Sequence, residues 1–198
     1  MNKQFFILIG RSGCGKGTQA DLLKQNLLQE GIKEVLHITT GGGFRDFIMK
    51  DNYVANLAKK VNDSGGLQPE FLAVWNWSNI FINTLKGDET VIFDGAPRKA
   101  FEVDMLHSAV SFFGYLKPIV IYIDVSEGWA RERLLGRGRE DDKEKEGVEN
   151  RMNWFETDVL SAIDIYMHDP RYDFIHINGE KTIEEVHKDI INKLATLA

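Results

Sequence analysis

A glycine-rich segment near the N-terminus carries the clearest chemical signal in the chain. Residues 10–18 read Gly-Arg-Ser-Gly-Cys-Gly-Lys-Gly-Thr and follow the apolar run Phe5–Ile9. Glycines at this spacing let the backbone curl so that successive N–H groups point at phosphate oxygens, and the N-terminus of a following helix adds a positive dipole end. Lys16 adds a mobile positive charge. The pattern predicts a phosphate-binding loop between a strand and a helix, and favours this over a glycine-rich turn that binds nothing.

Arginines beyond this loop could supply the charge that phosphoryl transfer requires. Transfer between two nucleotides brings several negative charges together, so its site gathers Lys, Arg and Mg²⁺ and excludes water. Arg98 follows Asp94-Gly95-Ala96-Pro97 at a predicted strand end, which favours a role in a site. Any other arginine taken alone is more simply a solvated surface charge, and Arg139 could pair with the acidic residues that follow it. The candidate set is Lys16, Arg45, Arg98, Arg133, Arg137, Arg139 and Arg151.

The order of these motifs resembles that of adenylate kinases and related nucleoside monophosphate kinases. The phosphate loop has the Gly-x-x-Gly-Lys-Gly-Thr form of that family, in which Gly17 replaces the Ser or Thr of the general pattern and Thr18 comes one residue later. Any one block is a weak signal, but the ordered set spans nearly the whole chain. The other blocks are Thr39–Arg45, Gly66–Glu70, Asp94–Arg98, Arg133–Asp142 and Asn178–Lys181.

This resemblance implies transfer of the γ-phosphoryl group of ATP to AMP, with Mg²⁺, and assigns a role to each matching residue. The catalytic residues would be Lys16, Arg98, Arg139 and Arg151. ATP would contact Gly13, Cys14, Gly15, Lys16, Gly17, Thr18, Arg133, Arg137 and Lys181. The monophosphate would contact Thr40, Arg45, Leu67, Gln68, Gly95, Arg98 and Glu102. Asp94 would orient Mg²⁺ through water.

Glu102 leaves the choice of acceptor base open. It falls where adenylate kinases usually have a base-reading Gln, whose amide can both accept from and donate to adenine. An ionised carboxylate only accepts, which suits the two adjacent donors of guanine. Thr40 matches the adenylate kinase form of its block, and Glu102 could equally be a surface residue of a helix. We expect AMP as the acceptor, with GMP as the main competitor and CMP or UMP as further ones.

A different class of protein, a regulatory module that hydrolyses ATP slowly, is the other alternative. Such a module would need the phosphate loop but not an acceptor-side pair such as Arg45 and Arg98. The arginines after the loop therefore favour a kinase.

Short apolar runs alternate with helical patterns and must position these residues. Repeated βα units predict a parallel sheet with helices on both faces. The resemblance implies an α/β P-loop nucleoside triphosphate hydrolase-like fold with strand order 2-3-1-4-5, as a single domain over 1–198 with an acceptor-binding insert over 39–68 and a short lid over 136–147. We expect strands at 5–9, 35–38, 90–93, 119–123 and 174–177. We expect helices at 16–29, 44–60 with a break near 51–52, 70–86, 101–112, 127–135, 149–166 and 183–197.

Composition excludes several classes of function. A net charge of −6 disfavours a protein that binds nucleic acid, because such proteins carry a basic surplus. Cys14 is the single cysteine, so neither an intramolecular disulfide nor a multi-cysteine zinc site can form. No apolar run approaches the ~18 residues of a membrane span, and Phe5–Ile9 is too short for a signal-peptide core. We expect a cytoplasmic monomer.

Overall fold

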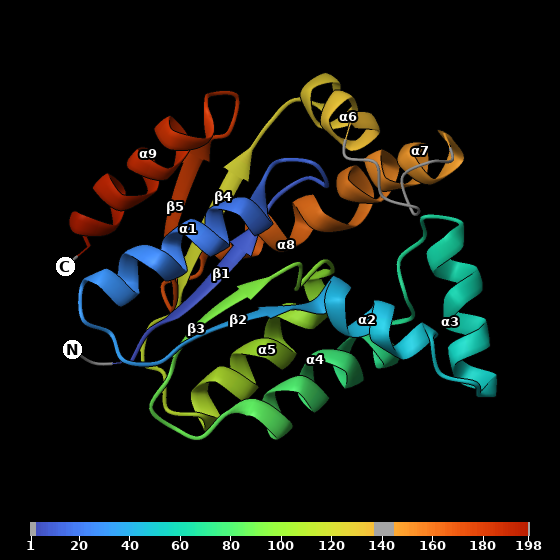
Figure 1. Cartoon of the computed structure of the whole chain (residues 1–198), viewed down its shortest axis with the longest axis horizontal. Helices are drawn as coiled ribbons and strands as arrows, with labels where there is room; N and C mark the ends of the chain where they lie inside the picture. Colours follow the sequence, from blue (N-terminus) through green and yellow to red (C-terminus); the bar gives the residue numbers. More distant parts are fainter. Residues whose placement is uncertain (1–2, 137–144, 198) are drawn as a thin grey trace.

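Five parallel strands form the centre of the computed structural model, which describes residues 3–136 and 145–197 (Figure 1). Their order, β2-β3-β1-β4-β5, is the predicted one, and every neighbouring pair is parallel. The fold class inferred from the sequence is therefore confirmed. The strands are β1 (Phe5–Ile9), β2 (Val35–Thr39), β3 (Thr90–Asp94), β4 (Ile119–Asp124) and β5 (Asp173–Asn178).

Helices cover both faces of this sheet. No helix in the described ranges is both long and apolar enough to cross a membrane. The helices are α1 (Lys16–Gln29), α2 (Thr40–Ile48), α3 (Tyr53–Asp63), α4 (Glu70–Thr84), α5 (Ala100–Phe112), α6 (Glu127–Gly136), α7 (Lys145–Trp154), α8 (Leu160–His168) and α9 (Ile183–Ala195). A π-helix, η2 (Phe155–Val159), joins α7 to α8.

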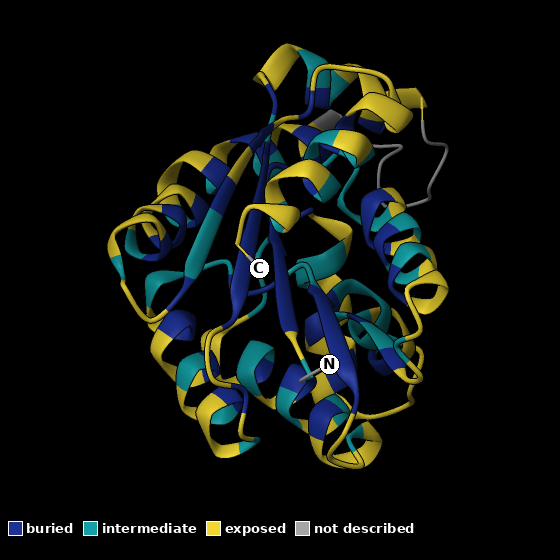
Figure 2. Ribbon diagram, turned by 90° about the vertical axis from the view of Figure 1, so that its left-hand side faces the viewer, coloured by how far each residue is buried: buried dark blue, intermediate teal, exposed yellow. Residues whose placement is uncertain are grey.

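The period-2 geometry of the strands divides the core into two layers. In β1, Phe5, Ile7 and Ile9 face the layer formed with α4, α5 and α8. Phe6 and Leu8 face the opposite layer, formed with α1 and α9. Alternate side chains of a strand point to opposite faces, so a strand buried on both sides must be apolar throughout. Figure 2 shows the result, with buried strands at the centre and exposed residues on the outer faces of the helices.

The carboxyl ends of three strands meet at one edge of the sheet. Asp94 at the end of β3 pairs in register with Leu8 of β1 and with Thr39 of β2. The phosphate loop follows β1, the start of α2 follows β2, and the Asp94–Arg98 block follows β3. Open α/β sheets place their ligands at this edge. The topology therefore brings the segments that follow β1, β2 and β3 to one place.

The predicted break in the second helical segment is confirmed. The chain forms α2 and α3 as separate helices, and the Asn52 side chain accepts a hydrogen bond of 2.9 Å from the Ala55 N–H at the start of α3. A side chain that caps a helix in this way satisfies a donor that has no partner within the helix. The first of the two helices begins at Thr40, earlier than the predicted residue 44.

The prediction of one helix over 149–166 is wrong in two respects. Helix α7 begins at Lys145, inside the segment 136–147 that was expected to be a loop, and η2 interrupts the helix before α8. Glu146 in the first turn complements the positive end of α7. Val148 and Met152 are buried and anchor α7 in the core. The rest of the expected lid, residues 137–144, lies outside the described residues.

The connection between α3 and α4 packs closely against α7. The Asn150 side chain donates to the Ser64 carbonyl (2.6 Å), and the Trp154 indole N–H donates to the Gly65 carbonyl (3.1 Å). Gly65 has φ 69°, and a Cβ there would lie 2.5 Å from the Gly147 carbonyl oxygen. Glycine is thus needed at position 65, where the two backbones meet. Figure 1 shows α3 and α7 close together at this end of the molecule.

Replacing Gly65 by Ala should weaken this contact. Gly31→Ala is a matched control, since Gly31 also has positive φ (91°) but a Cβ there would meet nothing within 4 Å. Both variants carry the left-handed backbone cost of about 1–2 kcal/mol. We expect Gly65→Ala to lower the free energy of unfolding by a further 1–3 kcal/mol or so, because its Cβ is overpacked. Urea unfolding measures both, and equal losses in the two variants would contradict the contact.

Candidate active site

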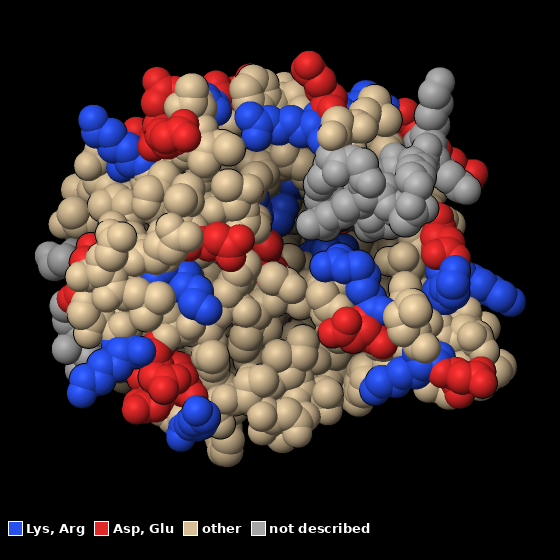
Figure 3. Space-filling model, viewed as in Figure 1, with Lys and Arg blue, Asp and Glu red and all other residues tan. Residues whose placement is uncertain are grey.

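A cleft of about 1040 Å³ opens at the carboxyl edge of the sheet. Figure 3 shows Lys and Arg side chains recessed in the middle of this face of the molecule. The phosphate loop, α2, the α3–α4 connection, the segment after β3, α6 and α7 all contribute to its wall. The predicted site residues that line it are Gly13, Gly15, Lys16, Gly17, Thr18, Thr40, Arg45, Leu67, Gln68, Asp94, Gly95, Arg98, Glu102, Arg133 and Arg151.

Two predicted ATP contacts do not line this cleft. The Cys14 side chain is buried in the core beneath the loop, and its backbone N–H donates to the Arg11 carbonyl at 3.1 Å. The Lys181 ammonium pairs with Asp189 on α9 at 2.7 Å and lines a separate, smaller hollow. Arg137 and Arg139 lie outside the described residues. Cys14 therefore behaves as a small residue that fits its place.

The Lys16 ammonium is held over the phosphate loop by the loop itself. The ammonium group donates hydrogen bonds to the backbone carbonyls of Gly10 (2.8 Å) and Arg11 (3.0 Å). Gly15 next to it has φ 94°, and a Cβ there would meet nothing within 4 Å. The loop thus presents its charged side chain and an open backbone to the same cleft, an arrangement that suits a polyphosphate.

The Asp94 carboxylate faces the start of α1. A Cβ added to Gly17 would lie 3.7 Å from Asp94 Oδ2, and both residues line the cleft. Carboxylate oxygens are the ligands that Mg²⁺ prefers, usually one or two of them together with water and substrate phosphates. Within the described ranges no cluster of three or more His, Cys, Asp or Glu residues could hold a metal ion alone. The residues present fit an ion that is shared between Asp94 and a nucleotide.

Arg98 and Arg151 form a positive wall of the cleft. The Arg98 Nε donates to the Gly95 carbonyl at 2.8 Å, and its guanidinium lies 5.1 Å from the centre of the Trp154 ring. Burial lowers the pKa of Arg98, and the Arg151 charge lowers it further, whereas the Glu102 carboxylate opposes this shift. Two arginines close enough to repel each other within a cleft form a strong anion site.

Glu102 is buried, so the alternative that it is a surface residue of its helix is wrong. Only 3% of it is exposed, and one carboxyl oxygen accepts a hydrogen bond of 3.2 Å from the Arg98 backbone N–H. Burial raises the pKa of this carboxyl, although the Arg98 backbone and charge partly offset the shift. Its neighbours Val103 and Leu106 anchor the same side of α5 in the core. A buried carboxyl that lines the cleft is placed to meet a ligand.

The other predicted acceptor residues lie on α2 and on the α3–α4 connection. The Asn76 side chain on α4 donates to the Thr40 carbonyl at 3.1 Å. A Cβ at Gly43 would lie 2.5 Å from the Asn76 side-chain oxygen, so only glycine lets the two helices approach this closely. Asn76 thereby fixes the start of the helix that carries Arg45. The sequence has no signal for this role, since Asn76 is one polar residue in an apolar helix.

Aromatic rings beside the arginines were also missed by sequence reasoning. The Arg133 guanidinium lies 4.8 Å from the centre of the Trp129 ring, one turn earlier on α6. The Trp154 ring lies similarly close to the Arg98 guanidinium, and both Trp129 and Trp154 line the cleft. Trp129 and Arg133 are four residues apart, a spacing too common in helices to indicate a site. Trp154 and Arg98 are distant in the sequence and meet only in the folded chain. A ring at this distance attracts a guanidinium group and limits its movement.

Comparison with known proteins identifies the family of the chain. The family model described as adenylate kinase matches residues 8–170. An adenylate kinase of Nautilia profundicola is 31% identical over 191 residues, which cover 93% of this chain and 92% of the relative. An adenylate kinase of Mycobacterium leprae is 36% identical over 163 residues, 81% of this chain and 84% of the relative. On the fold, the phosphate loop and these matches, the chain belongs to the adenylate kinase family.

Proposed function

We propose that the chain transfers the γ-phosphoryl group of ATP to AMP and so produces two ADP. The observation that carries this proposal is the meeting of two positive groups in one cleft. Lys16 and the open phosphate loop form one side, and the adjacent Arg98 and Arg151 form the other. A module that only hydrolyses ATP would not need the second group. The relatives reported above are named adenylate kinase.

The two substrates would approach the cleft from opposite sides. The phosphates of ATP would lie on the backbone of the phosphate loop, with Lys16 on the terminal phosphates and Arg133 nearby, backed by Trp129. The segment 39–68 would act as the acceptor insert, in which Thr40, Arg45, Leu67 and Gln68 line the cleft. Gly95, Arg98 and Glu102 would complete the acceptor side.

The chemistry would depend on position and charge rather than on an acid–base pair. Negative charge on the transferring group is stabilised by preorganised cations, which cost no rearrangement during the reaction. Lys16, Arg98 and Arg151 would provide that charge, and Arg139 would join them from the short lid over 136–147. Closure of the lid excludes water, which would otherwise accept the phosphoryl group.

The nucleotide would arrive with Mg²⁺, and Asp94 would hold that ion through water. Bound Mg²⁺ neutralises charge on the phosphates of ATP. We further propose a cytoplasmic monomer that needs no nucleic acid or membrane. A single cysteine, Cys14, suits a reducing compartment.

Lys16→Met should reduce turnover by about 10³-fold or more while the fold stays intact, because it removes a major charge contact to the transferring group. Coupled assays with ATP and AMP measure turnover, and circular dichroism with thermal melting reports the fold. Lys188→Met on the exposed side of α9 is the control. Wild-type turnover in folded Lys16→Met would remove the basis of the proposed function.

Glu102→Gln should increase the preference for AMP over GMP by about tenfold in kcat/KM, the effect of one hydrogen bond of about 1.4 kcal/mol. The amide can donate to the adenine ring nitrogen, whereas the carboxylate cannot. Initial rates with AMP, GMP, CMP and UMP test this, with Asp104→Asn on the exposed side of α5 as the control. A wild type that prefers GMP would show that AMP is the wrong acceptor. An unchanged preference in Glu102→Gln would show that Glu102 does not read the base.

Glu102→Gln should also make the protein more stable than the wild type near neutral pH. The folded-state pKa of Glu102 is raised above its usual value of 4.5 because of burial, so ionisation costs stability as the pH rises through the folded pKa. The amide does not ionise, and the advantage should vanish at pH values below about 4.5, where both states of the wild type are protonated. Melting temperatures of the two proteins from pH 4 to 8 measure this difference. A constant difference across that range would contradict the raised pKa.

A further inference from the structure

Arg11 lies in the phosphate loop, but its side chain turns away from the cleft. The loop has two cationic side chains, and only Lys16 lines the cleft. Arg11 is 8% exposed, which is unusual for an arginine, since burial of a guanidinium is costly unless it is paired. Its separation from the cleft means that a direct contact with phosphate does not account for it.

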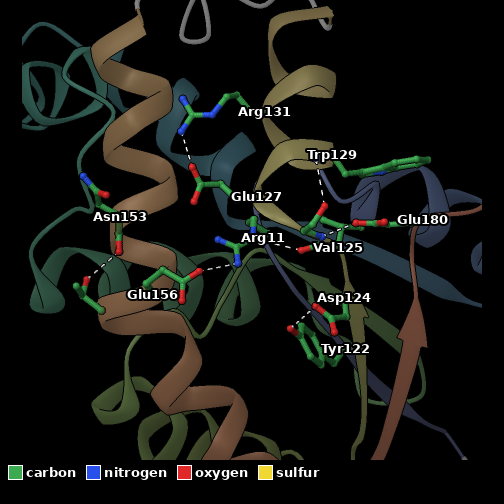
Figure 4. Close-up of polar contacts among 12 residues, drawn as sticks. Arg11, Tyr122, Asp124, Val125, Glu127, Trp129, Arg131, Asn153, Glu156 and Glu180 are labelled. Atoms are coloured by element: carbon green, nitrogen blue, oxygen red, sulfur yellow. Dashed lines mark hydrogen bonds and ion pairs between the residues drawn. The ribbon is translucent and has the colours of Figure 1, made fainter.

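The Arg11 guanidinium contacts the π-helix η2 instead. One terminal nitrogen donates to Glu156 Oε1 at 2.6 Å, and the guanidinium lies 4.0 Å from the centre of the Phe155 ring. The Nε lies 3.4 Å from the Val125 carbonyl oxygen, just after β4. Figure 4 shows Arg11 between this strand end and the helix that carries Glu156. The ion pair with Glu156 and the ring contact with Phe155 together hold η2 against the phosphate loop.

This contact is better explained by geometry than by stability. Glu156 is half exposed in the pair, and a partly solvated ion pair contributes little free energy of folding. Replacing an ion pair of this kind by apolar side chains of similar size is often neutral for stability. An arginine adds directionality, because its planar guanidinium group donates hydrogen bonds only in fixed directions. π-helical turns within longer helices are frequent at functional sites, because the extra residue shifts the side chains on either side of it.

The segment that Arg11 contacts continues directly into the arginine wall of the cleft. Phe155 and Glu156 are the first residues of η2 and follow Trp154 and Arg151 of α7. Trp154 in turn lies against Arg98 and donates to the Gly65 carbonyl. The phosphate loop is therefore joined through Arg11 to the helix whose other contacts reach Arg98 and the acceptor side.

We propose that Arg11, with Glu156 and Phe155, is a positioning residue for phosphoryl transfer. It sets the separation between the phosphate loop with Lys16 and the helix with Arg151. The proposal rests on the proposed function, in which these two groups act on the same phosphoryl group. Each substrate keeps its own contacts when Arg11 is lost, so the effect should fall on kcat rather than on KM.

The kinetic test compares Arg11→Met, Arg11→Lys, Glu156→Gln and the double variant Arg11→Met/Glu156→Gln. We expect Arg11→Met to lower kcat by up to about 10²-fold, the scale of a small misplacement of reacting groups, with both KM values within about threefold of wild type. Arg11→Lys should recover part of the loss, because it retains the pair with Glu156. The double variant should be no slower than the worse single one, because the two residues act as one unit. Additive losses, or a folded Arg11→Met with wild-type kcat, would overturn the proposal.

A second measurement does not depend on activity. Hydrogen exchange should become faster in Arg11→Met both at residues 10–15 and at residues 151–159, since the contact that joins them is gone. Arg171→Met is the matched control, because Arg171 also pairs with a carboxylate and contacts a ring, Tyr172, but far from the cleft. Unchanged exchange in both segments would overturn the proposal. A wild type that does not use ATP with AMP would instead overturn the proposed function, and the exchange result would still decide whether Arg11 joins the loop to the helix.

Discussion

Mutually repelling positive charges are held together at one edge of the sheet, and the rest of the structure depends on how this is achieved. Lys16, Arg98 and Arg151 line one cleft, and the Arg151 charge lowers the pKa of Arg98. Backbone carbonyls hold two of these groups, at 2.8 Å each for Lys16 with Gly10 and for Arg98 with Gly95. Such contacts hold each cation in place without neutralising it, so the charge stays available to a phosphate. A site of this kind is preorganised at the expense of folding stability.

The helix α7 with its π-helical continuation is the element that the different parts of the cleft share. Asn150 and Trp154 contact the carbonyls before α4, Trp154 also lies against Arg98, and Phe155 and Glu156 contact Arg11 of the phosphate loop. A rigid helix transmits a shift at one of these contacts to the others, since packed side chains move together. In the proposed reaction, α7 and η2 would keep the ATP side and the acceptor side of the cleft at a fixed separation.

The buried carboxyl of Glu102 shows how one residue can serve both the fold and specificity. Its contact with the Arg98 backbone ties α5 to the segment after β3, and the same residue lines the cleft where a base would lie. A carboxyl has one proton fewer than a glutamine amide, so its raised pKa matters for what it can donate. Either a glutamate or a glutamine could accept the hydrogen bond from the Arg98 backbone. The two residues differ more in which hydrogen bonds they can donate to a bound ligand.

The local patterns of the sequence determined the strands, the phosphate loop and the order of the motifs. Residues 5–18 alone predict a strand, a glycine-rich loop and the start of a helix. The signals are the apolar run, the backbone freedom of the glycines and the position of the lysine, and all of them depend only on residues near in sequence. The break at Asn52 likewise follows from its own cap. Tertiary structure decided the burial of Glu102, the early start of α7 and the place of Lys181 outside the cleft. It also turned Arg11 toward Glu156, a residue 145 positions further along the chain. Such contacts depend on which distant surfaces the fold brings together, and no local preference of an arginine or a glutamate specifies that partner.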